Sequence, residues 1–350
     1  MLVSSQISRV STVESLVNIW TNRYFPDVSM VSIDDDPLIR GRLREASLEN
    51  GRNRTAEKLD KHLVEQQCTL AAVRARGLYS YYETSTFRET AQFAKLISRI
   101  YLKLLEVYSE LSPIVMASKG NLSEKFGNIS LEAWGIPKID KLSDALEPLL
   151  LELQNQFMVT NKWRSLGFIT TQINLSNALL LEQLTPAEQV LISSYFKFIE
   201  EQVCLPLQRV CLAAAKHSQN SPAFTIVERM LPLASEISAA VHERWFAAFP
   251  NYDSRRGQLN NPDVRHSSVR DFDMFQVYLW LCLLEGNLTF VEQELRSVCI
   301  LVFDALNIPW SMTVKGTMFL ADEILKQLQP HERELVSPYT RGMVKAFSNR

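Results

Sequence analysis

Glycine is scarce in this chain, with eleven residues among 350. The sequence has no G-x-x-x-x-G-K-[ST] loop and no G-x-G-x-x-G turn, the glycine-rich patterns in which backbone N–H groups hold phosphates. It also lacks the H-E-x-x-H zinc helix and the G-x-S-x-G nucleophile turn. Because no catalytic constellation is visible, we expect a protein that is not an enzyme and carries no cofactor.

Cysteine is also sparse, and its spacing excludes two classes of site. The five cysteines are odd in number and include no C-x-x-C pair, which argues against a disulfide framework and a zinc knuckle. His217 and His242 are not spaced as metal ligands with each other or with any cysteine. The apolar neighbours of the cysteines predict small buried thiols in a reducing compartment, and we expect no metal site.

Long apolar runs are missing as well. The longest, Val277 to Leu284, is far below the roughly 20 residues that span a bilayer. The first 20 residues alternate polar and apolar side chains, so they lack the continuous apolar core of a signal peptide. We therefore expect a cytoplasmic protein without a membrane partner. Its formal net charge of −2 means that nucleic acid could bind only at a local cationic patch.

Strand-type alternation is absent, and helical periodicity takes its place along the chain. Thr185, Pro186 and Glu188 have the spacing of a capping box at a helix start, and Pro206 is expected to bend or split the helix that follows. With 46% hydrophobic and 22% charged residues, the chain has the composition of a folded protein. These features predict an all-α, multi-helical orthogonal or bundle-like globular fold with no significant sheet.

The segment 120–137 is broken by glycine and proline and suggests a boundary between two halves. We expect an N-terminal helix and linker over residues 1–37, an N-terminal helical region over 38–130 and a C-terminal helical domain over 131–350. The alternative is that 120–137 is only a long connection within one domain.

Two further stretches carry structural expectations. Residues 55–82 predict one long helix that ends at a cluster of tyrosines (Tyr79, Tyr81, Tyr82), which we expect to fill a gap between helices rather than stack on bases. Residues 250–268 show no helical periodicity and predict a long loop. An apolar helix over 271–284 follows, with Asp271 and Asp273 at its start, where they would complement the helix dipole.

Cationic side chains gather in two places, around the predicted loop and within the arginine-rich segment 38–54. A cationic loop beside a buried helix is a plausible phosphate-binding surface, because local positive charge in a near-neutral protein gives salt-sensitive binding to DNA. The candidate DNA-contacting residues are Arg255, Arg256, Arg265, His266, Arg270, Arg52 and Arg54.

The same arginines have a second interpretation. Asp253, Asp263, Asp271 and Asp273 nearly balance the four arginines of the loop region, so the charges could pair within the protein or meet an acidic protein partner. The glutamates interleaved through 38–57 equally allow a solvated helical face with i,i+4 pairs.

A helix, a sharp turn and a capped helix around 184–206 have the outline of a helix-turn-helix, but also of any two neighbouring helices. The first turns of the second helix offer only Glu188, Gln189, Ser193 and Ser194 to read bases. A recognition helix normally presents arginine, asparagine or glutamine there, so the sequence does not place a DNA-reading helix securely.

Two extended segments resemble the HetZ family and its HetZ-related paralogues of filamentous cyanobacteria. They are residues 164–169 with 179–217 (RSLGFI and LLLEQLTPAEQVLISSYFKFIEEQVCLPLQRVCLAAAKH), and residues 264–295 (VRHSSVRDFDMFQVYLWLCLLEGNLTFVEQEL). The resemblance covers the C-terminal two-thirds of the chain. It implies a cytoplasmic, DNA-binding transcriptional regulator of heterocyst differentiation. The alternative is a non-enzymatic helical adaptor that binds another regulatory protein.

Overall fold

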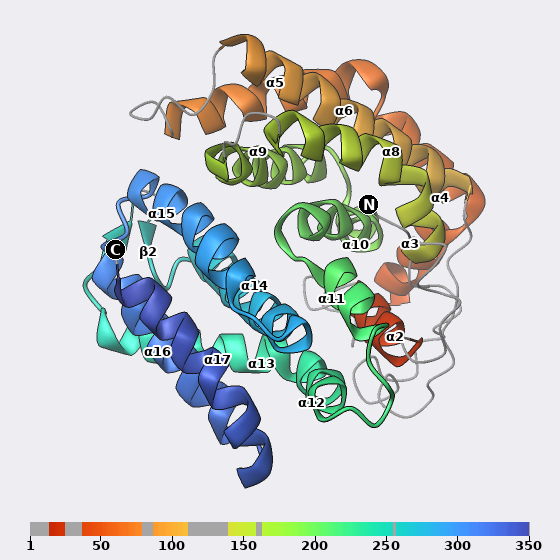
Figure 1. The fold of residues 1–350 in the computed structure, drawn as a ribbon. Helices are drawn as coiled ribbons and strands as arrows, with labels where there is room; N and C mark the ends of the chain where they lie inside the picture. The colour runs from red at the N-terminus through yellow and green to blue at the C-terminus, as the bar shows by residue number, and fades with distance from the viewer. Residues whose placement is uncertain are drawn as a thin grey trace.

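A computed structural model of the chain describes residues 14–24, 37–78, 87–110, 139–158, 163–254 and 257–349 (Figure 1). The described residues fold into packed helices with one two-stranded hairpin, so the all-α prediction is confirmed. In the hairpin, β1 (Asp253–Ser254) pairs antiparallel with β2 (Gly257–Gln258), and Gly257 has a φ of +112°, which favours glycine. No helix among the described residues has the length and apolar composition that crossing a membrane requires.

The N-terminal part is a group of helices in which α5 packs along α6 and α9, and α8 packs on α6 (Figure 1). Its elements are α2 (Glu14–Asn22), α3 (Pro37–Ser47), α4 (Glu49–Lys58), α5 (Lys61–Leu78), α6 (Phe87–Glu110), α8 (Ile139–Met158) and α9 (Trp163–Leu181). The single helix predicted for 55–82 is wrong, because the chain breaks at Leu59 and Asp60. There the Asp60 carboxylate accepts a hydrogen bond from the Leu63 N–H at 2.8 Å and so caps the start of α5. The predicted tyrosine cluster lies outside the described residues.

The predicted capping box and proline break both form. In α10 (Pro186–Cys204) the Glu188 carboxylate accepts hydrogen bonds from the Thr185 N–H at 2.9 Å and from its hydroxyl at 2.8 Å. Pro206 separates α10 from α11 (Leu207–Ala214), since its ring cannot continue the α10 hydrogen bonding.

The C-terminal helices surround α14 (Pro262–Glu285), which packs against α11, α13 and α17 (Figure 1). The other elements are α12 (Pro222–Met230), η3 (Leu231–Leu233), α13 (Ala234–Ala248), η4 (Phe290–Leu295), α15 (Arg296–Ala305), α16 (Trp310–Lys326) and α17 (Pro330–Ser348). Every residue from Phe272 to Leu284 is buried, and this run forms the middle of a core that extends from Leu16 to Phe347.

The helix α14 starts earlier than the sequence suggested. Residues 262–268, predicted as loop, form its first two turns, where the Ser268 hydroxyl donates to the Val264 carbonyl at 2.8 Å. These turns show no apolar periodicity, because Val264 is the buried residue among those of the two turns whose burial is described. Asp271 and Asp273 therefore lie inside the helix, and not at its N-terminus as predicted. The predicted domain boundary at residue 130 lies outside the described residues and stays a prediction.

Candidate functional site

The structure describes five of the seven predicted cationic residues, separates them into two places, and gives three of them acidic partners. On α14, the exposed Arg265 pairs with Glu243 of α13 at 3.2 Å, and His266 beside it is exposed. Arg270 is largely buried and pairs with Glu200 of α10 and with Asp271 at 3.0 Å. Arg255 and Arg256 lie outside the described residues.

The two arginines of α4 do not join this group. Arg54 is exposed and pairs with Glu45 at 2.6 Å. Arg52 is only 4% exposed, its Nη1 donates to the Ser47 carbonyl at 3.1 Å, and its Nε has no hydrogen-bond partner. No carboxylate among the described residues lies within ion-pair distance of Arg52. A guanidinium at this depth does not offer its charge to a phosphate backbone.

In the helix-turn-helix candidate, α9 and α10, the polar side chains at the start of α10 form hydrogen bonds within the protein. The Gln189 amide donates to the carbonyls of Leu181 and Leu184 at 2.9 and 3.0 Å. Glu188 is buried and also accepts from Lys58 at 2.8 Å. Because α10 is enclosed by other helices, its first turns present no polar face to a DNA groove.

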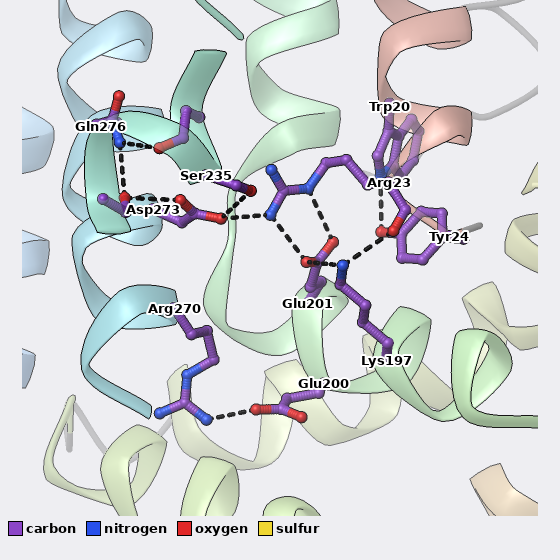
Figure 2. Close-up of polar contacts among 12 residues, drawn as sticks. Trp20, Arg23, Tyr24, Lys197, Glu200, Glu201, Ser235, Arg270, Asp273 and Gln276 are labelled. Atoms are coloured by element: carbon purple, nitrogen blue, oxygen red, sulfur yellow. Dashed lines mark hydrogen bonds and ion pairs between the residues drawn. The ribbon is translucent and has the colours of Figure 1, made fainter. Parts of the chain in front are cut away.

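The most elaborate polar cluster instead joins three helices around Arg23, just after α2 (Figure 2). Arg23 reaches the carboxylate of Glu201 on α10 through Nε at 3.3 Å and Nη2 at 3.0 Å. The same Nη2 lies 2.9 Å from Oδ2 of Asp273 on α14. Burial alone would lower the pKa of Arg23, but the two carboxylates raise it on balance, so the guanidinium stays charged.

Asp273 is held from its other side by α13 (Figure 2). The Ser238 hydroxyl donates to Oδ1 at 2.7 Å, and the Ser235 hydroxyl lies 3.3 Å from Oδ2. The Gln276 amide donates to the Ala234 carbonyl and to the Ser238 hydroxyl, both at 2.8 Å. The carboxylate is 4% exposed, and these hydrogen bonds fix its direction toward Arg23.

Aromatic side chains pack beside this ion cluster. The indole of Trp20 stacks on Phe198 with ring centroids 6.3 Å apart, and Tyr24 meets the same ring edge-on at 5.4 Å. Trp20 Nε1 donates to the Tyr24 hydroxyl at 2.9 Å. Lys197, whose side chain is about half exposed, donates to the backbone carbonyl of Arg23 at 2.9 Å (Figure 2).

A second buried polar cluster is centred on Glu200, which precedes Glu201 in α10. The Glu200 carboxylate accepts a hydrogen bond from the Arg270 guanidinium. It also accepts hydrogen bonds from the side-chain amides of Asn174 and Asn177, both at 3.3 Å. The Tyr101 hydroxyl lies 2.5 Å from Asn177 Oδ1. Burial would raise the pKa of Glu200, but the charge and hydrogen bond of Arg270 offset this and lower it on balance.

The sequence interpretation missed the residues of the Arg23 cluster as a group. Asp273 and Gln276 were detectable as polar residues within an otherwise apolar run, which in a buried helix requires polar partners. No sequence pattern near Arg23 or Glu201 indicates that these residues are the partners of Asp273. Among the described residues, no group of histidine, cysteine, aspartate and glutamate could hold a metal ion. In the Arg23 cluster, the carboxylates of Glu201 and Asp273 converge on the guanidinium of Arg23.

Comparisons with known proteins give one partial match. Residues 213–347, less than half of the chain, match the model of the phycobilisome protein family, which has a globin-like all-helical fold. No curated protein and no solved structure matches the chain. The matched segment runs from the end of α11 into α17, so it contains Asp273 but neither Arg23 nor Glu201. No match is to the HetZ family, and that resemblance stays a prediction.

Proposed function

We propose that this protein is a non-enzymatic helical adaptor that binds another protein. The observation that carries the proposal is that each of the four candidate arginines that the structure describes is either paired with a carboxylate or buried. Arg54, Arg265 and Arg270 each pair with carboxylates of the same chain, and Arg52 is buried. This observation supports the interpretation in which carboxylates of the same chain balance the arginines. It argues against the interpretation in which the arginines form a phosphate-binding patch.

The physical argument concerns what DNA binding would require. Affinity for a phosphate backbone comes largely from cations that displace its counterions. An arginine already paired with a carboxylate must lose that partner first, and the carboxylate then repels the phosphate. With a formal net charge of −2, the chain has no general excess of positive charge to compensate.

The match over residues 213–347 supports the same proposal. The matching family is described as phycobilisome protein, and the matched helices α12 to α17 would serve here as the protein-binding unit. The exposed apolar side chains of Met318 on α16 and Leu335 on α17 lie within this segment and are available for such contacts.

A DNA-binding regulator of heterocyst differentiation is the second candidate. Arg265 and His266 are exposed side by side near the start of α14, and this observation favours it. Among the described side chains, Glu243 is the carboxylate that pairs with Arg265, and because that ion pair is itself exposed it contributes little to stability.

One pair of assays separates the two candidates. The tagged full-length chain is used to capture partners with and without nuclease, and is titrated against labelled DNA at several salt concentrations. The adaptor proposal expects a stoichiometric protein partner that survives nuclease, and DNA binding that does not change in Glu243→Gln, which frees Arg265. Salt-sensitive DNA binding that strengthens in Glu243→Gln and weakens in Arg265→Ala would overturn it.

A further inference from the structure

The helix α2 is short, and it is held by a compact set of side chains. It has nine residues, fewer than an isolated helix needs for stability in water. Its helical form therefore depends on docking. Leu16, Trp20 and Tyr24 are at most 5% exposed and supply the apolar part of that contact. The surface that receives them, with Lys197, Phe198, Glu201 and Asp273 at its centre, is called the α2 seat below.

The polar part of the α2 seat requires a cation that contacts both Glu201 and Asp273. Glu201 and Asp273 are 3% and 4% exposed, come from different helices and converge on a single guanidinium. The Lys197 ammonium lies 3.8 Å from Glu201 and is half exposed, so it does not replace that cation for Asp273. Without Arg23, two carboxylates would remain buried with like charge and no shared partner.

The geometry selects arginine over lysine. The planar guanidinium reaches both oxygens of Glu201 through Nε and Nη2, while Nη2 also serves Asp273. A lysine ammonium cannot reproduce this planar fork. Phe198 adds a second criterion, because it accepts one aromatic ring three residues before the arginine and another directly after it.

We propose that the α2 seat is a protein-docking site that accepts an arginine-bearing amphipathic helix from a partner protein, with α2 as its built-in occupant. The inference rests on the proposed adaptor function and names the class of partner. Because an empty seat would leave Glu201 and Asp273 without their cation, α2 is exchanged only for a helix that brings its own arginine and flanking aromatic residues. That requirement makes the exchange specific.

The test uses the full-length chain and a fluorescent peptide with the sequence of residues 14–24. In Trp20→Ala/Arg23→Ala the built-in occupant is weakened, so the peptide is expected to bind at least tenfold more tightly than it binds the unaltered chain. A matched peptide with citrulline at the arginine position keeps the shape but lacks the charge, and is expected to bind at least tenfold more weakly. Equal binding of the two peptides, or no gain over the unaltered chain, overturns the proposal.

A second variant keeps the test decisive if the first does not fold, as judged by circular dichroism. Glu201→Gln/Asp273→Asn preserves the shape of the α2 seat and removes both charges. It is expected to bind the arginine and citrulline peptides within about twofold of each other. If this variant still bound the arginine peptide tenfold more tightly than the citrulline peptide, Glu201 and Asp273 would not be the groups that recognise arginine, and the docking proposal would be refuted.

A final arm separates this inference from the adaptor function. A partner captured by the unaltered chain is challenged with excess arginine peptide or citrulline peptide. Release by the arginine peptide alone supports the α2 seat. A partner that stays bound while the peptide occupies the seat refutes the docking inference and leaves the adaptor function standing. If no partner is captured, the adaptor function fails and the peptide affinities alone decide whether the seat binds a helix in trans.

Discussion

The Nη2 atom of Arg23 lies 2.9 Å from Oδ2 of Asp273, across 250 positions of sequence. This contact and the bidentate pairing with Glu201 tie the end of α2 to both α14 and α10. Both carboxylates are buried, so they depend on one cation from a segment far away in the chain. The stability of α10 and α14 is therefore linked to the docking of α2.

Replacing Arg23 tests that link. Arg23→Ala is expected to lower the free energy of unfolding by about 3–5 kcal/mol, because it leaves two buried carboxylates without their partner. Arg54→Ala is the matched control, since Arg54 forms an exposed ion pair with Glu45 and its loss should change stability by about 0–1 kcal/mol. Urea unfolding followed by circular dichroism measures both, and equal effects would contradict the buried link.

Acid should weaken the protein through Glu200. Its pKa is lowered in the folded state, so its contribution is present above the ordinary carboxyl pKa of about 4.3 and is lost as pH falls through the folded value. Glu200→Gln is expected to lower stability at pH 7 and to flatten the decline of the urea midpoint below about pH 4.5. Glu106→Gln, which removes only an exposed pair with Lys103, serves as control. An unchanged acid slope in Glu200→Gln would reject the assignment.

A second pH effect should arise at His242, at a higher pH. Burial, and then the nearby charge of Arg265, lower its pKa below the ordinary value of 6.5, while Glu243 acts in the opposite direction. The unfolded chain therefore binds the proton first, so this contribution is complete above about pH 6.5 and decreases as pH falls toward the folded pKa. His242→Phe is expected to reduce the loss of thermal stability between pH 7 and pH 5. His62→Ala, at an exposed position of α5, should keep the loss seen in the unaltered chain.

Two glycines should respond to alanine in opposite directions. A Cβ at Gly51 would lie 2.1 Å from the Glu45 carbonyl oxygen, so Gly51→Ala must displace α4 from α3 and is expected to destabilise the protein by more than 1 kcal/mol. Gly77 in α5 has open space around it, and Gly77→Ala should stabilise by about 0.4–1 kcal/mol through the unfolded chain. Thermal unfolding of the pair distinguishes them, and a stabilised Gly51→Ala would contradict the close packing.

Local chemistry was enough to predict several elements. The capping box of Thr185 and Glu188 and the break at Pro206 depend on residues only a few positions apart, and both form as expected. The burial of Cys68 and Cys211 was also expected from their apolar neighbours. The break at Asp60 was missed because helical periodicity continues on both sides of a residue that caps the next helix.

Long-range pairing could not be predicted in the same way. The sequence suggested that aspartates of the same stretch would balance Arg265 and Arg270. The structure instead supplies Glu243 from α13 and Glu200 from α10, and among the aspartates whose side chains are described Asp271 also pairs with Arg270. Which carboxylate meets which arginine is decided by helix packing, and hydrophobic periodicity alone does not encode the order in which helices become neighbours.

The order of synthesis gives the Arg23 contact a further consequence. At ribosomal rates of about 5–20 residues per second, α2 leaves the ribosome roughly 10–50 seconds before Asp273 is added. Glu201 is also synthesised late, so during much of translation the nascent α2 segment has neither of its acidic partners. The chain therefore completes this contact near the end of its production, and a nascent α2 stays accessible to other proteins until then.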